Sequence, residues 1–123
     1  MISTKDNKYR KHYPKEDEIK ANDFNVGAIV KDEVKRLGKH ANLNHIDVSE
    51  VTDMSALFHK LDFDGDIFLW DVSNVVDMSG MFANSTFNGD ISHWDVEKVK
   101  NHNHCFDCSP LEKQLDKQPK FIP

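Results

Sequence analysis

The stretch IDVSEVTDMSALFHKLDFDGDIFL (46–69) is followed at once by WDVSNVVDMSGMFANSTFNGDISH (70–93), and the two align without a gap. They are identical at 12 of 24 positions. The next block, WDVEKVKNHNHCFDCSPLEKQLDK (94–117), keeps six identities with the second. We name these blocks the first, second and third repeat. Repetition at this fixed period predicts a solenoid, because each unit buries its apolar face against the next.

Apolar residues recur at three positions around the start of each repeat. The three columns are Leu43, Ile67, Ile91 and Leu115; Ile46, Trp70 and Trp94; and Val48, Val72 and Val96. The pattern apolar-x-x-apolar-x-apolar is typical of the opening of a leucine-rich repeat. Its last two apolar positions alternate with polar ones, as a short strand requires. The predicted fold is therefore α/β: a short leucine-rich-repeat-like solenoid with parallel stacked strands.

The second half of each repeat supplies further core residues. We expect Ser55 and Ser79 to cap a short helix or 3-10 turn. Its inner side would carry Met54, Leu57 and Phe58 in the first repeat and Met78, Met81 and Phe82 in the second, with Phe63 and Phe87 following. Gly65 and Gly89 would allow the tight corner that leads to the next strand.

The chain divides into four parts within one predicted domain, 1–123. A polar N-terminal segment (1–21) precedes a capping helix (22–42), the repeats (43–106) and an irregular C-terminal cap (107–123). The helix is expected between the N-cap Asn25 and the C-cap Gly38. Its inner stripe is Val26, Ile29, Val30, Val34 and Leu37, and its outer face is Lys31, Asp32, Glu33, Lys35 and Arg36. Tyr9, Tyr13 and Pro14 are the residues expected to hold the first segment against the body.

Composition narrows the classes of function. The net charge of −5 argues against direct binding of nucleic acid, which needs a basic surface, and favours a protein partner with a basic surface. The sequence holds neither an apolar run of membrane-spanning length nor the apolar core of a secretory signal at its start. Two cysteines do not make a disulfide framework. We therefore expect a cytoplasmic protein without a cofactor.

The repeat WDVSNVVDMSGMFANSTFNGDISHWDV resembles that of the bacterial BspA-like leucine-rich repeat proteins. KDEVKRLGKHANLNHIDVSEVTDMSALF is similar to the leading segment of short members, and CFDCSPLEKQ is similar to their C-terminal end. The resemblance covers residues 26–117 and is weakest in the third repeat. It implies a repeat fold and a binding role, including adhesion at a bacterial surface, with no catalytic residues to transfer.

The segment HNHCFDC (102–108) holds both cysteines and two histidines. His102, His104, Cys105 and Cys108 have the ligand types for zinc, and the C-x-x-C spacing also allows a redox pair. The repeat register favours a third interpretation. Cys105 aligns with Met81 and His102 with Met78, so both would take core positions, Cys105 as a small buried apolar residue.

Aspartates form three columns at the repeat spacing. Asp53 with Asp77, and Asp66 with Asp90, are expected to bond backbone N–H groups in turns. Asp66 lies in a DGD sequence that lacks the other ligands of a calcium loop. For the column Asp47, Asp71 and Asp95, turn bonding and contact with a partner are both open. The predicted partner-binding residues are Asp47, Ser49, Asp71, Ser73, Asp95 and Glu97.

The predicted function is non-enzymatic protein binding through this acidic strand face. A small intracellular inhibitor or immunity-type protein fits first, because an acidic face can occlude a basic surface and speed association. One form of it is a phage-borne antagonist of a nucleic-acid-binding defence enzyme such as a CRISPR effector. A surface or adhesion protein is the alternative. An enzyme would require chemistry in the segment 102–108.

Overall fold

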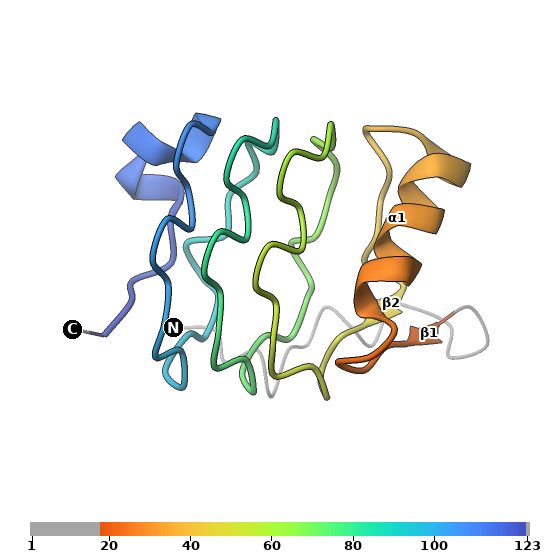
Figure 1. The fold of residues 1–123 in the computed structure, drawn as a ribbon, viewed down its shortest axis with the longest axis horizontal. Helices are drawn as coiled ribbons and strands as arrows, with labels where there is room; N and C mark the ends of the chain where they lie inside the picture. Colours follow the sequence, from red (N-terminus) through yellow and green to blue (C-terminus); the bar gives the residue numbers. More distant parts are fainter. Residues whose placement is uncertain (1–17, 123) are drawn as a thin grey trace.

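The computed structural model describes residues 18–122. The predicted contacts of Tyr9, Tyr13 and Pro14 lie outside this range. In chain order the elements are strand β1 (Ile19–Lys20), helix α1 (Val26–Leu37), strand β2 (Ile46–Asp47) and the 3-10 helices η4 (Pro110–Lys113) and η5 (Leu115–Lys117). Helix α1 stands at one end of the row of repeats, and η4 and η5 stand at the other (Figure 1).

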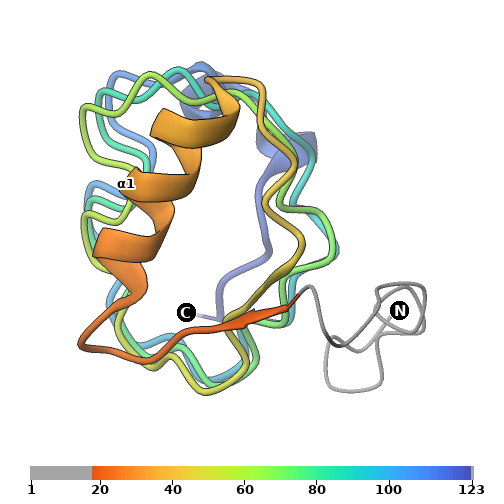
Figure 2. The same ribbon diagram turned by 90° about the vertical axis from the view of Figure 1, so that its right-hand side faces the viewer.

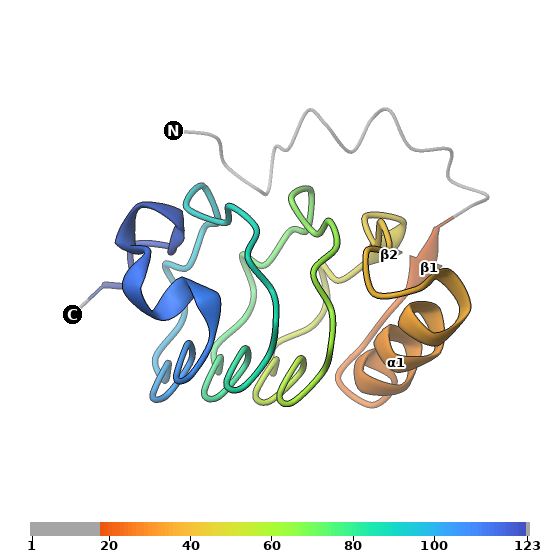
Figure 3. The same cartoon turned by 90° about the horizontal axis from the view of Figure 1, so that it is seen from above.

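The three repeats lie one behind another and share one path of the backbone (Figures 2 and 3). Hydrogen bonds join neighbours at equivalent positions. N–H groups of the first repeat donate to the second in the pairs Met54–Asp77, Ala56–Ser79, Phe58–Met81 and Lys60–Ala83, at 2.8–3.0 Å. The second repeat donates to the third in the pairs Met78–Asn101, Gly80–Asn103, Phe82–Cys105 and Asn84–Asp107, at 2.8–2.9 Å. At these positions each repeat therefore donates N–H groups to the following repeat and offers carbonyl groups to the preceding one.

Regular strands are fewer than the sequence pattern predicts. β2 covers Ile46–Asp47 and pairs in parallel with β1, with Ile19 opposite Ile46. The equivalent residues 70–72 and 94–96 are not strand; elsewhere, isolated parallel bridges join Asn42 to Asp66 and Asp77 to both Asp53 and Asn101. These pairings are all parallel. β1 was not predicted, because a two-residue strand leaves no periodic signal. The leucine-rich-repeat class itself stays a prediction.

Turns replace the short helices expected after Ser55 and Ser79. Two residues in each repeat have left-handed backbone: Ala56, Gly80 and His104 have φ of 56°, 61° and 60°, and Lys60, Asn84 and Cys108 have φ of 59°, 58° and 54°. A right-handed helical turn cannot include such residues. The capping prediction was therefore wrong, while the predicted inner positions Met54, Leu57 and Phe58 are buried.

Aromatic rings stacked from repeat to repeat fill the core. Phe82 lies between Phe58 and Phe106, with ring centroids 5.3 and 5.7 Å away and interplanar angles of 1° and 5°. Trp70 and Trp94 repeat the arrangement at 6.5 Å and 9°. Every second-repeat residue in these stacks is at most 1% exposed. Offset stacking of this kind adds to the stabilisation from burial, so the repeat period is visible in the core itself.

Gly65 shows why a corner needs glycine. A Cβ atom at this position would lie 1.9 Å from the carbonyl oxygen of Ala41. The backbone of the preceding corner passes too close for any side chain, and the N–H of Asp66 donates to that same oxygen at 3.0 Å. The predicted role of Gly65 is confirmed, with close approach of two backbones as its cause.

Helix α1 has the predicted bounds, and Val26, Val30 and Val34 face the core as expected. Three predictions about it were wrong. Leu37, assigned to the inner stripe, is 44% exposed at the end of the helix. Asn25 makes no side-chain cap bond, and Glu33, assigned to the outer face, is 6% exposed.

The Glu33 carboxylate accepts hydrogen bonds from Arg36 Nε at 2.7 Å and from His45 Nε2 at 2.5 Å. The Arg36 bonds, followed by His45, lower the pKa of Glu33 to about 2 against the effect of burial. The hydrogen bond to His45 ties the helix to the residue just before β2.

The C-terminal cap consists of η4, η5 and the residues after them. Within it Leu111 is fully buried as part of the core, and Pro119 is buried as well. The Lys117 carbonyl accepts the N–H of Ile91 at 3.0 Å, which fastens the cap to the second repeat.

No helix within residues 18–122 has the length and apolar content to cross a bilayer.

Candidate functional site

The six predicted partner-binding residues lie at one corner of the successive repeats. Asp47, Asp71 and Asp95 occupy equivalent positions there. The Oδ1 of each accepts the N–H two residues on, at 3.0 Å from Ser49, 3.0 Å from Ser73 and 3.1 Å from Glu97. This is an Asx-turn, in which the aspartate side-chain oxygen takes the place of a backbone carbonyl as the acceptor of the turn's hydrogen bond. The column therefore has the turn role, which offsets the repulsion between like charges.

The turn role does not exclude contact with a partner. An ionised carboxylate has two oxygens, and the turn bonds of Asp71 and Asp95 use Oδ1 only. Ser73 Oγ donates to the same Oδ1 of Asp71 at 2.6 Å. The fixed Oδ1 orients the second oxygen without occupying it, so the turn role is compatible with contact with a partner, which stays a prediction.

The other two aspartate columns make the same turn bond, as predicted. Asp53 and Asp77 accept the N–H of Ser55 and Ser79 at 2.9 and 2.8 Å. Asp66 and Asp90 accept the N–H of Phe68 and Ser92 at 2.9 and 3.0 Å. The pKa of Asp90 is lowered, first by the hydroxyl of Ser92. Asn42 and Asn101 make the equivalent bonds at 3.0 and 3.1 Å, so an amide serves these corners as well as a carboxylate does.

A groove of about 200 Å³ gathers four of the six residues. It is lined by Asp71, Ser73, Asn74, Asp95, Glu97 and Lys98. Three carboxylates face one ammonium group there, so the groove is acidic. Asp47 and Ser49 lie at the same corner of the first repeat but outside the groove. The structure thus brings together the second- and third-repeat members of the predicted set.

Asn74 and Lys98 are lining residues that the sequence interpretation missed. Lys98 Nζ donates to Asn74 Oδ1 at 2.9 Å, and Asn74 Nδ2 donates to the carbonyl of Ser49 at 2.8 Å. The chain of bonds spans all three repeats along the groove. Their signal was available, because Asn74 and Lys98 follow Ser73 and Glu97 directly and are one repeat apart.

Asp95 and Glu97 also border a second hollow, of about 260 Å³. Trp94, Val96 and Ile122 line it with apolar surface, and Lys120 comes from the C-terminal cap. An apolar hollow next to an acidic groove provides two different contacts for one partner. Residues 120–122 were predicted only as part of the cap.

The segment 102–108 does not gather its four candidate zinc ligands. Cys105 is 3% exposed, while Cys108 is exposed and neither is in a disulfide. His104 Nδ1 pairs with Asp107 Oδ2 at 2.6 Å, and the ring of His102 stacks on Phe121 at 4.1 Å. Within residues 18–122, no three His, Cys, Asp or Glu side chains are grouped as a metal site.

The repeat register explains Cys105 but not His102. Cys105 takes the buried place of Met81, and burial raises the pKa of its thiol to about 12. His102 was expected in the buried place of Met78, and it is exposed instead. The reason is its position at the end of the row: no further repeat covers it, and Phe121 shields only one face of its ring.

Comparison with known proteins bears on the whole repeat region. A family model described as "Mycoplasma protein of unknown function, DUF285" matches residues 28–118. The chain belongs to this family. The match begins inside α1 and ends just after η5, so the three repeats and the acidic groove all lie within it. The family is related to the BspA-like repeat proteins. No curated protein and no solved structure matches the chain.

Proposed function

We propose that this protein is a non-enzymatic binding module of the BspA-like leucine-rich repeat type, which holds a protein partner with a basic surface. The observation that supports it is the acidic groove between Asp71, Ser73, Asp95 and Glu97. The turn bonds hold its aspartates in place, so little side-chain entropy is lost on binding. Asp47, the last residue of β2, and Ser49 continue the same corner into the first repeat.

The partner's charge follows from the groove. Three carboxylates around a shallow cavity attract lysine and arginine side chains and repel acidic surfaces. Complementary charge speeds association and selects partners more than it increases affinity. A small inhibitor that occludes a basic surface is therefore the favoured role. The apolar hollow beside Trp94 and Ile122 would supply contact area that charge alone does not.

A surface or adhesion role is the second candidate, because the resemblance of the repeat to that of the BspA-like proteins implies such a role. Both candidates use the same face and differ in where the partner is found. An intracellular inhibitor should retain a protein from a bacterial cytosolic extract. An adhesion module should retain a host or envelope component instead.

Affinity capture from cytosolic and envelope extracts tests the face. The variant Asp71→Asn with Asp95→Asn removes two charges from the groove and keeps the turn acceptor, as Asn101 does at another corner. We expect about tenfold weaker retention of a salt-sensitive partner, without a change in melting temperature. The matched control is Asp66→Asn with Asp90→Asn, which removes two charges from another corner and should leave retention unchanged. Equal loss in both variants would assign the effect to net charge, and the proposed face would be wrong.

A further inference from the structure

The first repeat has carbonyl groups that lack the donors their equivalents have. In the second repeat, the carbonyls of Asp77, Ser79 and Met81 accept N–H groups of the preceding repeat at 2.8–2.9 Å. The equivalent carbonyls of the first repeat belong to Asp53, Ser55 and Leu57. Within residues 18–122, no N–H or side-chain donor bonds to any of the three. Three acceptors in a row are left for a donor from outside.

Helix α1 is the cause of this gap. It stands where a further repeat would stand, on the side toward which these carbonyls point. A helix uses its N–H groups along its own axis and has none to offer sideways. The helix covers the end of the core through Val26 and Val30, but it does not complete the row of bonds.

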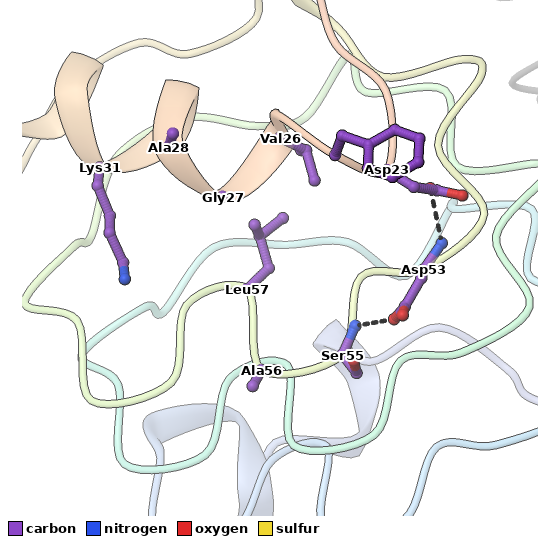
Figure 4. Close-up of a pocket in the computed structure, with 10 residues that line it drawn as sticks. Asp23, Val26, Gly27, Ala28, Lys31, Asp53, Ser55, Ala56 and Leu57 are labelled. Carbon is purple, nitrogen blue, oxygen red and sulfur yellow. Dashed lines mark hydrogen bonds between the residues drawn. The ribbon is translucent and has the colours of Figure 1, made fainter.

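A hollow of about 270 Å³ lies between α1 and this row (Figure 4). On the helix side it is lined by Asp23, Phe24, Val26, Gly27, Ala28 and Lys31, and on the first-repeat side by Asp53, Ser55, Ala56 and Leu57. Two carboxylates border it. Asp23 is held by Thr52, whose N–H and hydroxyl both donate at 2.7 Å, and by the N–H of Asp53 at 3.2 Å. These bonds, the Thr52 hydroxyl first, lower the pKa of Asp23, so it stays ionised.

Phe24 gives the hollow an aromatic edge. Its side chain is 99% exposed, the most exposed large apolar residue described. Lys31 is the one cationic lining residue. The lining thus combines unpaired carbonyl oxygens, two carboxylates and an open ring face. The Lys31 ammonium group and the N–H groups of Gly27 and Ala28 at the start of α1 oppose them.

We propose that this hollow receives an arginine side chain of a protein partner. A guanidinium group carries five N–H donors and no acceptor, which matches the carbonyl and carboxylate acceptors on the first-repeat side of this lining. It also stacks on aromatic faces, as Phe24 would allow. The site lies at the α1 end of the molecule and stands apart from the acidic groove, so the inference holds whether or not that groove binds a partner.

Titration of the whole isotope-labelled protein with the blocked tripeptide Gly-Arg-Gly, followed by NMR, tests the proposal. We expect amide shifts at Gly27, Ser55, Ala56 and Leu57 with a dissociation constant of about 1–10 mM, as suits a single side chain. The same tripeptide with citrulline, which has the shape of arginine without its charge, should bind at least about fivefold more weakly. Shifts that are absent, or equal for both peptides, would overturn the proposal.

Three variants locate the binding. Phe24→Ala should weaken it about threefold by removing the stacking face. Asp53→Asn should weaken it by a similar factor while keeping the turn bond to Ser55, and Lys31→Gln should strengthen it. The matched control is Asp77→Asn, the same change one repeat further on, where binding should not alter. A blocked Gly-Glu-Gly tripeptide that binds in place of the arginine peptide would show that Lys31 and the helix N-terminus dominate, and the proposed ligand class would be wrong.

Discussion

The second and third repeats have the same backbone and different surroundings. Gly80 and His104 have φ of 61° and 60°, and Asn84 and Cys108 have φ of 58° and 54°. Both repeats make the same corner bonds and the same aromatic stack. Yet Met78 is 1% exposed while His102, at the equivalent position, lies on the surface. The second repeat has a repeat on each side, and the third has one on only one side.

This difference separates the features that a repeat's own sequence determines from those that depend on the neighbouring repeats. The turn bonds in which Asp or Asn accepts the N–H two residues further on are local. They therefore persist in the third repeat, although most of its sequence identity with the second repeat is lost. Burial depends on the next repeat and ends with the row. Substitutions at paired positions should therefore cost different amounts in the two repeats.

The stacked phenylalanines should give the largest difference. Phe82→Ala leaves a cavity between Phe58 and Phe106, and we expect a loss of about 4–5 kcal/mol in the free energy of unfolding. Phe106 has a stacked ring neighbour in the second repeat and only a tilted contact with Phe121 beyond it. Phe106→Ala should therefore cost about 3 kcal/mol or less. Urea unfolding followed by tryptophan fluorescence measures both, and an equal cost would mean that the cap packs as well as a repeat does.

Exchanging the residues at the position occupied by Met78 in the second repeat and His102 in the third tests the effect of burial directly. Met78→His places a polar ring in the core with no partner, which should cost about 2–3 kcal/mol. Its cost should grow as pH falls below about 6.5, because the unfolded chain then binds a proton that the buried ring resists. His102→Met should change stability by less than about 0.5 kcal/mol. A large effect of His102→Met on unfolding would show that its stack on Phe121 matters more than exposure suggests.

The sequence period was enough to predict the core but not the ends. Met54 and Met78 are 24 residues apart, as are Phe58 and Phe82, and the burial of these residues follows from stacking of the repeats alone. His102 has the same spacing, yet its exposure depends on the absence of a following repeat, which no local pattern records. β1 is similar: a two-residue pairing depends on where the chain passes and leaves no periodicity.

The candidate site was predictable in part for the same reason. Asp71, Ser73, Asp95 and Glu97 fall at one corner by register, and the structure groups them. The hollow beside α1 was not predictable, because it arises from a mismatch between a helix and a repeat. Glu33 was placed on the wrong face, since its partner His45 lies 12 residues away in sequence. The repeat register predicts which equivalent residues of successive repeats lie side by side. Contacts between a helix and a repeat follow no such register and are seen only in the structure.

The two cysteines sharpen the comparison within the third repeat. Cys105→Ser puts a hydroxyl at the buried position equivalent to Met81 and should lower the free energy of unfolding by about 2 kcal/mol. Cys108→Ser, at an exposed position, should lower it by less than about 0.5 kcal/mol. Cys105 has a pKa raised to about 12 by burial, so it should resist alkylation at pH 8 in the folded protein. Differential alkylation with mass spectrometry measures this. Equal losses in both variants, together with a lower melting temperature after chelation, would instead support a shared metal.

Substitutions at the left-handed position of Gly80 and His104 should change the free energy of unfolding least. They should also separate the contribution of backbone conformation from that of burial most clearly. Gly80→Ala keeps a left-handed φ of 61° with a residue that disfavours it, and should cost about 1 kcal/mol. A Cβ atom there meets nothing within 4 Å, so the cost is conformational and involves no clash. His104→Gly relieves the same strain in the third repeat and should add up to about 1 kcal/mol of stability. Because backbone geometry is common to both repeats, these two changes should be opposite in sign and similar in size. If His104→Gly lowers stability, the ion pair of His104 with Asp107 outweighs the strain, and the third repeat is held by its side chains as well as by its corners.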